Sequence, residues 1–417
     1  MSSVFLIATL DTKGREADFV RQLLGAWGVA VTLVDAGALG APAVEADVSR
    51  AQLFALGGTP LDEVRRRADR GEAVTVAARG AARLAREAFS RGDLQGVLGL
   101  GGSAGTTIAT AAMQTLPLGV PKVMVSTLAS GTVRQFVGDK DIFMLNAVVD
   151  ILGLNRISRQ VLSQAAAAMA GLVAHPPPLP ESADRPLVAA TMFGVTTPCV
   201  ERARETLERT GYEVLVFHAT GNGGQAMESL IAEGLIAGVL DLTTTELADE
   251  EVGGFLSAGP RRLEAAAAAG VPQVVSTGAL DMVNFYGPDS VPEKFRARWF
   301  HRHNANVTLM RTTAEENAAI GATIARKLTA ATGPVAVLLP GRGVSAIDRA
   351  GQPFDDPAAR RALHDAIRSG LPGADVTELD LHINDPAFAD TAARKLVELM
   401  KAAPASSRRA RTLNARS

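Results

Sequence analysis

The stretch GVLGLGGSAGTT, residues 96–107, decides the fold class of this 417-residue chain. Its first half is short and apolar, which is typical of a buried parallel strand. Its second half is rich in glycine and hydroxyl residues, which predicts a tight turn before a helix at residues 106–114. A strand, a glycine turn and a helix in succession form the building unit of an α/β sheet with crossover helices.

The same alternation extends outward from this stretch. Further short apolar runs predict strands at residues 4–9, 29–34 and 123–126, and a longer mixed run predicts a helix at residues 16–27. Near the end of the chain, residues 335–339 and 376–381 read as strands and residues 386–400 as a last helix. The sequence therefore predicts an α/β protein with parallel sheets.

The second half of the chain repeats the first in outline. GVAVTLVD at residues 28–35 is echoed by GYEVLVFH at 211–218, and VPKVMVST at 120–127 by VPQVVST at 271–277. Between the halves, residues 175–186 contain five prolines, which predicts an extended connector. We expect two Rossmann-like, doubly wound domains at residues 1–175 and 187–402, a connector at 176–186, and a disordered basic tail at 403–417.

Composition excludes several classes of function. Lys plus Arg number 42 against 44 Asp plus Glu, so no summed positive field favours nucleic acid or an anionic membrane. The first apolar run, at residues 4–10, is too short for a signal segment or a membrane span. Cys199 is the single cysteine, so no disulfide forms within the chain. We expect a cytoplasmic protein with no nucleic-acid or membrane partner.

The glycine-rich turn is the strongest candidate site. Backbone amides and the positive end of a following helix favour an anion, so a phosphate fits this turn. It is neither a Walker A loop nor a regular G-x-G-x-x-G, and a purely structural tight turn is the alternative. The residues predicted to bind a nucleotide phosphate here are Gly101, Gly102, Ser103, Ala104, Gly105, Thr106 and Thr107.

Three other strand ends of the first half should meet this turn. The first strand leads into Asp11, Thr12 and Lys13, which either bind the ligand or cap the first helix. Asp35 ends the second strand, where a carboxylate can accept ribose hydroxyls. Ser130 and Gly131 belong to a hydroxyl-rich turn that can add a third wall.

The second half offers candidate catalytic and substrate-binding residues at its own strand ends. The acid or base candidates are His218, Glu246 and His301. The alternative for Glu246 is a plain position in the first turn of a helix. The His301 pair lacks an assignable third ligand, so we predict no metal site. A small polar substrate is predicted to contact Thr220, Gly221, Asn222, Gly223, Gly224, Thr243, Thr244, Thr245, Asp281 and Asn284.

Taken together, these segments resemble the family of bacterial and fungal proteins similar to the N-terminal ATP-binding domain of the tomato mosaic virus resistance protein. The resemblance covers residues 4–400 and includes ATLDTKG at 8–14, GGSAGT at 101–106, MVSTLASG at 124–131, GLNRISR at 153–159, FGVTTPC at 193–199, FHATGNGG at 217–224, LDLTTTELAD at 240–249, GALDMVNF at 278–285 and HNANVTLMRTT at 303–313. It implies two Rossmann-like subdomains, ATP as the cofactor and self-association into a homo-oligomer.

These observations lead to one main hypothesis and two alternatives. The main hypothesis is an ATP-dependent enzyme that acts on a small polar molecule in a cleft between two domains, with Mg²⁺ as an optional companion of the nucleotide. The first alternative is a non-catalytic, oligomeric ATP-binding module that binds another protein. The second keeps the fold but gives the glycine-rich turn a substrate phosphate or carboxylate in place of ATP.

Overall fold

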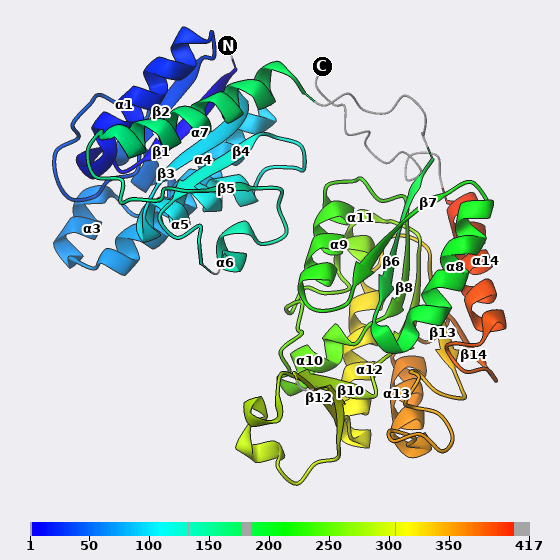
Figure 1. The fold of residues 1–417 in the computed structure, drawn as a ribbon. Coiled ribbons are helices and arrows are strands. Elements are labelled where there is room, and N and C mark those ends of the chain that lie inside the picture. Colours follow the sequence, from blue (N-terminus) through cyan, green and yellow to red (C-terminus); the bar gives the residue numbers. More distant parts are fainter. Residues whose placement is uncertain (1, 132, 177–184, 305, 404–417) are drawn as a thin grey trace. The chain divides into compact units, whose positions relative to one another are not determined.

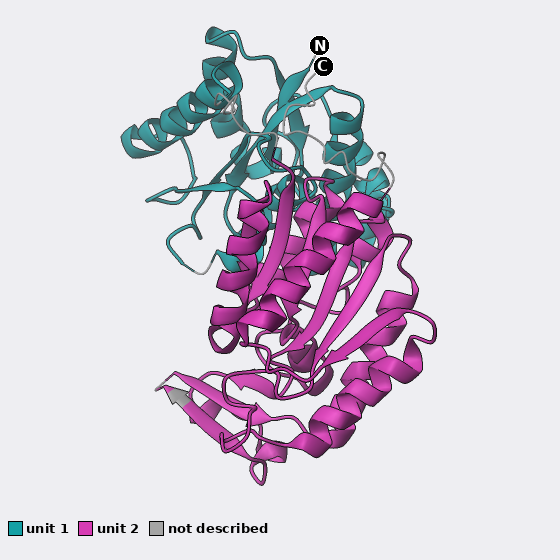
Figure 2. Cartoon of the chain, turned by 90° about the vertical axis from the view of Figure 1, so that its right-hand side faces the viewer, with its two compact units in different colours: residues 1–181 teal, residues 182–417 magenta. Residues whose placement is uncertain are grey.

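The chain divides into two compact units, residues 1–181 and 182–417 (Figure 2). A computed structural model describes residues 2–131, 133–176, 185–304 and 306–403. The division falls within the predicted connector, but residues 177–184 of that connector and residues 404–417 of the predicted tail lie outside the described residues. Each unit is therefore described by itself.

The first unit is built on one parallel sheet whose strand order is β2-β1-β3-β4-β5. Every neighbouring pair of strands runs parallel, and β1 pairs with β2 on one side and β3 on the other. Chain order reverses between β1 and β3, so this is the topological switch point of the sheet. The strands are β1 (Ser3–Ala8), β2 (Val31–Asp35), β3 (Leu94–Gly101), β4 (Lys122–Ser126) and β5 (Phe143–Asn146).

Helices cover both faces of this sheet, and each face has its own apolar core (Figure 1). On one face α2, α4 and α5 contribute Phe54, Val76 and Ile108 to the core, and on the other α1 and α7 contribute Leu10 and Leu162. The helices are α1 (Leu10–Ala26), α2 (Arg50–Leu56), α3 (Leu61–Arg67), α4 (Arg70–Ser90), α5 (Ser103–Gln114), α6 (Arg134–Val137) and α7 (Arg156–Ala174).

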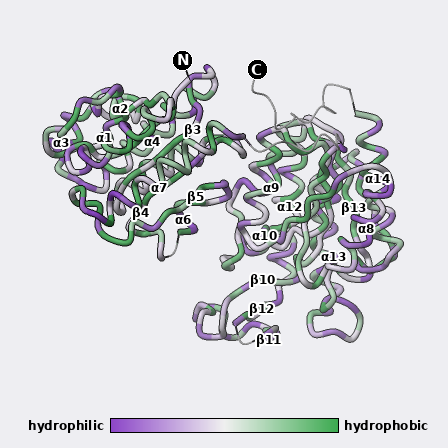
Figure 3. Tube along the Cα trace, turned by 45° about the horizontal axis from the view of Figure 1, so that its top comes forward, coloured by the Kyte–Doolittle hydropathy of each residue, from purple (hydrophilic) through white to green (hydrophobic). Residues whose placement is uncertain are grey.

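The second unit repeats this topology with one strand more. Its parallel sheet has the order β14-β13-β9-β8-β6-β7, so its switch point lies between β6 and β8. The alternation of apolar strands with mixed helices in each unit can be followed in Figure 3. The strands are β6 (Leu187–Met192), β7 (Glu213–His218), β8 (Gly238–Thr243), β9 (Gln273–Gly278), β13 (Val335–Pro340) and β14 (Asp375–Leu379).

Helices again cover both faces, and a small antiparallel sheet is inserted after β9. On one face α8 and α14 pack together, and the other is covered by the remaining helices. The helices are α8 (Thr197–Arg209), α9 (Asn222–Ala232), α10 (Glu246–Val252), α11 (Ala265–Ala269), α12 (Ala314–Thr329), α13 (Pro357–Gly370) and α14 (Pro386–Ala402), and the inserted strands are β10 (Met282–Phe285), β11 (Phe300–Asn304) and β12 (Val307–Arg311).

The predicted fold class is confirmed, since both units are doubly wound α/β folds with parallel sheets. Two helix starts were predicted too late. Helix α1 begins at Leu10 instead of residue 16, and α5 begins at Ser103 instead of residue 106. In both places the chain turns into a helix directly after the strand, although its glycine and hydroxyl residues are those of a loop. The residues predicted there as loops therefore form first turns of helices.

Within the described residues, no helix is long and apolar enough to cross a membrane.

Candidate nucleotide site

Four of the seven residues predicted to bind a phosphate, namely Gly102, Ser103, Ala104 and Gly105, line a cavity at the switch point of the first unit. The cavity has a volume of about 670 Å³, which lies within the usual range for small-molecule sites. It is lined by Thr9, Asp11, Thr12, Lys13, Ala36, Ala38, Leu39, Phe54, Val64, Arg65, Ala68, Asp69, Arg70, Ala73, Val74, Gly102, Ser103, Ala104, Gly105, Ile108 and Asp150. The ends of β1 and β3 thus meet in one cavity, as parallel strands require.

The floor of the cavity is the first turn of α5. The amides of the first turn of a helix have no partner within the helix, and the helix dipole makes this end electropositive. The first bond back into this turn runs from the Thr106 amide to the Gly102 carbonyl at 2.8 Å, so the amides of Ser103, Ala104 and Gly105 precede it. This turn therefore offers a group of amide donors to an oxyanion in the cavity.

Glycine is required here by close packing between the strand and the helix. A Cβ atom on Gly101 would lie 2.6 Å from the Gly105 Cα atom, and one on Gly105 would lie 2.9 Å from the Leu100 carbonyl oxygen. By contrast, a Cβ atom on Gly102 would meet only the Thr127 hydroxyl, at 3.5 Å. Gly101 and Gly105 thus bring the start of α5 close to β3, whereas Gly102 has room for a side chain.

Basic side chains and an apolar wall complete the cavity. Lys13, Arg65 and Arg70 line it; Arg65 belongs to α3, and Arg70 is the first residue of α4. The apolar lining comes from α2, α3, α4 and α5 and includes Phe54, Val64, Val74 and Ile108. Positive charge can thus meet phosphate oxygens while the apolar wall can receive a flat base.

The Asp11 carboxylate forms hydrogen bonds within the protein. One of its oxygens, Oδ2, accepts hydrogen bonds from the amides of Leu39 at 3.0 Å and Gly40 at 3.2 Å. Thr12 shares a hydrogen bond of 2.8 Å with the Thr9 hydroxyl. Lys13 has non-helical backbone angles, φ −126° and ψ 15°, at a kink in α1. Of the three residues, Lys13 is the one that lines the cavity with a mobile charge.

Asp35 does not line this cavity, which corrects the prediction that it faces a ribose there. Its side chain is buried, and Oδ1 accepts hydrogen bonds from the amides of Leu10 at 3.1 Å and Gly37 at 2.8 Å. Its other oxygen accepts a hydrogen bond of 2.6 Å from Nε of Arg50. The carboxylate is thus used to hold the ends of β1 and β2 together.

Five other predicted residues also lie outside the cavity lining, and the first of them is Gly101 at the end of β3. The Thr106 hydroxyl is buried against that of Ser126 at 2.7 Å, and Thr107 bonds back to the Ser103 carbonyl at 2.9 Å. Ser130 lines a separate cavity of about 390 Å³, and Gly131 forms a turn with Leu128. A contact of these five residues with a ligand in this cavity has no support in this structure.

The glycine-rich turn of the second unit already holds an anion, namely the Glu246 carboxylate. Its Oε1 atom accepts hydrogen bonds from the amides of Gly221 at 2.7 Å and Gly224 at 3.1 Å, at the start of α9. Its Oε2 atom accepts a hydrogen bond of 2.7 Å from Nε of Arg262. The other two nitrogens of Arg262 donate hydrogen bonds of 2.5 and 2.7 Å to Asp241. The phosphate-like position of this turn is therefore filled by the protein itself.

This arrangement does not support a catalytic role for Glu246. The side chain is fully buried, and each oxygen already accepts a hydrogen bond. Burial raises the pKa of its carboxyl group, and the Arg262 guanidinium opposes that rise. A general acid or base must reach its substrate within hydrogen-bond distance, which a fully enclosed side chain cannot do.

Five of the ten residues predicted to contact a substrate in the second unit are buried, and their side chains form hydrogen bonds within the protein. The Thr243 hydroxyl bonds to Thr196 at 2.8 Å, and the Thr244 hydroxyl donates to the Ser276 carbonyl at 2.9 Å. Nδ2 of Asn284 donates hydrogen bonds to the Thr245 hydroxyl at 3.3 Å and to the Asp249 carboxylate at 2.6 Å. The Ser345 hydroxyl donates one of 2.8 Å to the Asp281 carboxylate. Direct substrate contact by Thr243, Thr244, Thr245, Asp281 and Asn284 is not supported.

The glycines of that second turn have a packing reason instead. A Cβ atom on Gly223 would overlap the His218 carbonyl oxygen, and one on Gly224 would overlap the Glu246 carboxylate. Gly221 has φ +87°, a conformation that favours glycine. Asn222 is exposed, and Thr220 donates a hydrogen bond of 3.3 Å to the His218 carbonyl.

Two of the three catalytic candidates keep solvent access. His218 is exposed at the end of β7 and stacks on Phe193 at 5.5 Å between ring centroids. His301 is half-buried in β11 and meets the Phe354 ring edge-on at 6.1 Å. Among the described residues, no group of three or more His, Cys, Asp or Glu side chains is placed to hold a metal ion.

Sequence reasoning missed the arginines of both sites. Arg65 and Arg70 lie in the segment that appears in the first half alone, and Arg262 lies in an Arg-Arg pair outside every glycine-rich turn. The available signal was the charge of the inserted segment, in which RRR at residues 65–67 is followed by Arg70. Its meaning depends on the fold, because only the sheet topology brings this segment to the switch point.

Comparison with known proteins identifies close relatives over nearly the whole chain. The N-terminal domain of an uncharacterised protein family, UPF0261, matches residues 2–178, and the C-terminal domain of the same family matches residues 185–400. A UPF0261 protein of Clostridium tetani is 46% identical over 400 residues, covering 95% of this chain and 99% of that protein. One of Mesorhizobium japonicum is 48% identical over 396 residues, covering 94% and 98%.

A plant relative confirms the resemblance seen in the motifs. The ToMV resistance protein Tm-1(GCR237) of Solanum lycopersicum is 44% identical over 339 residues, which is 79% of this chain. The match spans 45% of the tomato protein, so more than half of that protein has no counterpart in the aligned region.

Proposed function

This chain belongs to the UPF0261 family, and from that premise together with the cavity at the β1/β3 switch point we propose that its first unit binds ATP. The observation that carries the proposal is that one cavity joins the amides at the start of α5, three basic side chains and an apolar wall. The choice of ATP follows from the resemblance of the motifs to an ATP-binding family.

The two ends of the cavity suggest how the nucleotide lies. Its phosphates would meet the amides of Ser103, Ala104 and Gly105, where the helix dipole favours negative charge. Lys13 would neutralise a terminal phosphate as a mobile point charge. The adenine ring would lie against the apolar wall that includes Phe54. A ribose contact is assigned to none of the described residues, because Asp35 is engaged elsewhere.

ATP use by an enzyme of small-molecule metabolism is the first candidate function. His218 and His301 support it, because both are solvent-accessible imidazoles in the second unit and such groups transfer protons near neutral pH. Mg²⁺ would accompany the nucleotide through its phosphate oxygens, as is common for ATP enzymes.

A non-catalytic, self-associating ATP-binding module is the second candidate. It is favoured by the burial of Glu246 and of the Thr243–Thr245 run, which removes the carboxylate and hydroxyl groups that an active site in the second unit would use. In such a module, ATP would stabilise the native unit that binds it by mass action.

A matched pair of variants tests the nucleotide site. Lys13 lines the cavity, whereas Arg15 is exposed on the same helix and does not line it. We expect Lys13→Gln to weaken ATP binding by roughly tenfold or more, since one charged hydrogen bond contributes about 1.5–3 kcal/mol, and Arg15→Gln to leave it near the parent value. Isothermal titration of the full chain with ATP and with AMP, each with and without Mg²⁺, measures this.

AMP separates recognition of the phosphates from recognition of the base. Because AMP lacks the outer phosphates, Lys13→Gln should weaken binding of ATP more than binding of AMP. If the parent chain binds neither nucleotide, the proposal is wrong. In that event, titration with inorganic phosphate would address the remaining alternative, in which the turn binds a substrate phosphate.

Turnover separates the two candidate functions. Release of phosphate from ATP is measured for the parent chain and for His218→Asn and His301→Asn. If the enzyme uses one of these imidazoles, the variant that lacks it should turn over ATP about 10²–10⁴-fold more slowly while still binding ATP. ATP binding without turnover in the parent chain would leave the binding module as the function.

A further inference from the structure

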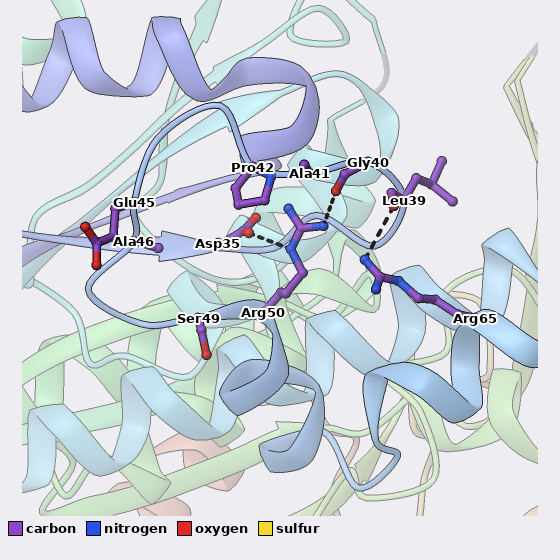
Figure 4. Close-up of a pocket in the computed structure, with 10 residues that line it drawn as sticks. All are labelled: Asp35, Leu39, Gly40, Ala41, Pro42, Glu45, Ala46, Ser49, Arg50 and Arg65. Atoms are coloured by element: carbon purple, nitrogen blue, oxygen red, sulfur yellow. Dashed lines mark hydrogen bonds and ion pairs between the residues drawn. The ribbon is translucent and has the colours of Figure 1, made fainter.

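A second cavity in the first unit lies beside Arg50, and its lining contains no residue of the α5 turn. Its volume is about 640 Å³ (Figure 4). It is lined by Asp35, Leu39, Gly40, Ala41, Pro42, Glu45, Ala46, Ser49, Arg50 and Arg65. Leu39 and Arg65 also line the proposed nucleotide cavity, so the two cavities adjoin along the segment at residues 38–40.

The guanidinium group of Arg50 is held rigidly at this cavity. Its Nε donates a hydrogen bond of 2.6 Å to Asp35, and its Nη1 donates one of 2.5 Å to the Gly40 carbonyl. Arg50 is 7% exposed, and its Asp35 partner is buried as well. Figure 4 shows the group between the Asp35 carboxylate and the backbone at Gly40. The arginine is therefore pre-organised, which lowers the entropy lost on binding a ligand.

The third nitrogen of this group, Nη2, has no hydrogen-bond partner among the described residues although it is buried. Leaving a buried donor unpaired is unfavourable, and a charged donor costs more than a neutral one. The wall beside it is formed by Gly40, Ala41 and Pro42, which are all exposed. Because Nη2 is buried, an oxygen atom can reach it only when the exposed residues beside it move.

We propose that this cavity binds the carboxylate of a small molecule, with Nη2 of Arg50 as its donor. The charged residues of the lining are Asp35 and Glu45 against Arg50 and Arg65, so their formal charges cancel. A singly charged carboxylate meets less repulsion from Asp35 and Glu45 than a doubly charged phosphate does. This proposal does not depend on ATP binding in the nucleotide cavity.

The test follows the Nε–H signal of Arg50 by NMR in the full chain labelled with ¹⁵N-arginine. The signal is assigned by its absence from the Arg50→Lys variant. Acetate, propionate and inorganic phosphate are the probes, each titrated at constant ionic strength with chloride as the balancing ion. We expect a saturable shift with the two carboxylates and a weaker response to phosphate.

Three variants locate the binding without touching Arg50 or Asp35. Ala41 is exposed and lines the cavity, so Ala41→Phe should fill it and weaken carboxylate binding by roughly tenfold or more, while Ala55→Phe on exposed α2 surface should not. Glu45 is exposed at the cavity, so Glu45→Gln should strengthen binding by removing a like charge. ATP binding should be unchanged in all three.

Three results would overturn the proposal. The first is the lack of a saturable shift with either carboxylate. The second is tighter binding of phosphate than of acetate and propionate. The third is an equal loss of binding in Ala41→Phe and Ala55→Phe, because only Ala41 lines the cavity.

Discussion

Replacing Glu246 by glutamine should destabilise the second unit, because no orientation of an amide satisfies its neighbours. The carboxylate accepts two backbone amides on Oε1, at 2.7 and 3.1 Å, and the Arg262 Nε on Oε2 at 2.7 Å. A glutamine has one acceptor oxygen and one NH₂ group. If its oxygen faces Arg262, its NH₂ group meets the amides of Gly221 and Gly224, and if it is flipped, its NH₂ group meets Arg262.

The expected loss is about 3 kcal/mol in the free energy of unfolding. Breaking a buried ion pair on one side costs about 3–5 kcal/mol. The lower end applies here because Asp241 still binds two nitrogens of Arg262, which keeps that charge neutralised. ATP binding by the first unit should be unchanged, since Glu246 belongs to the second.

Urea unfolding followed by tryptophan fluorescence measures this loss. The chain has two tryptophans, Trp27 in the first unit and Trp299 in the second, so a Trp27→Phe background reports on the second unit alone. Glu251→Gln is the matched control, because Glu251 is exposed on the same helix. A Glu246→Gln variant as stable as this control would refute the reasoning, and loss of ATP turnover in such a variant would restore a catalytic role.

Three further predictions concern protonation, backbone packing and the thiol. Burial raises the pKa of Asp249 to about 7 from 3.8. The unfolded chain loses this proton at a lower pH than the native one, so the second unit should lose up to about 1.4 kcal/mol of stability per pH unit between about pH 4 and 7. In urea unfolding across that range, the free energy of unfolding should depend less steeply on pH for Asp249→Asn than for the parent chain. A Cβ atom on Gly80 would overlap the Leu53 carbonyl oxygen, whereas one on Gly171 meets nothing within 4 Å; thermal unfolding should therefore show a large loss for Gly80→Ala and a gain of up to about 1 kcal/mol for Gly171→Ala. Burial raises the pKa of the Cys199 thiol, so iodoacetamide at pH 8 should modify it only after unfolding, and rapid labelling of the native chain would contradict its buried position.

The order of strands and helices could be predicted from local patterns in the sequence. The strand predicted at residues 335–339 matches β13, and the helix predicted at residues 386–400 matches α14. Both could be predicted because apolar runs and helical periodicity are local properties. The inserted sheet of β10, β11 and β12 was missed. Its strands carry His, Arg and Asn among their apolar residues, so the pattern resembled polar loops.

By itself, the sequence determined the fold class and the repeat of one topology, since strand–glycine–helix order is local and parallel strands end at a common edge. It also predicted a phosphate site at the first glycine-rich turn, which stays a prediction. Only the tertiary structure decided which polar residues are free. The two glycine-rich turns look alike in sequence, yet Glu246 fills the second, whereas the first opens on a cavity with Lys13, Arg65 and Arg70. Pairing and burial join residues far apart in the chain, so a local pattern cannot predict them.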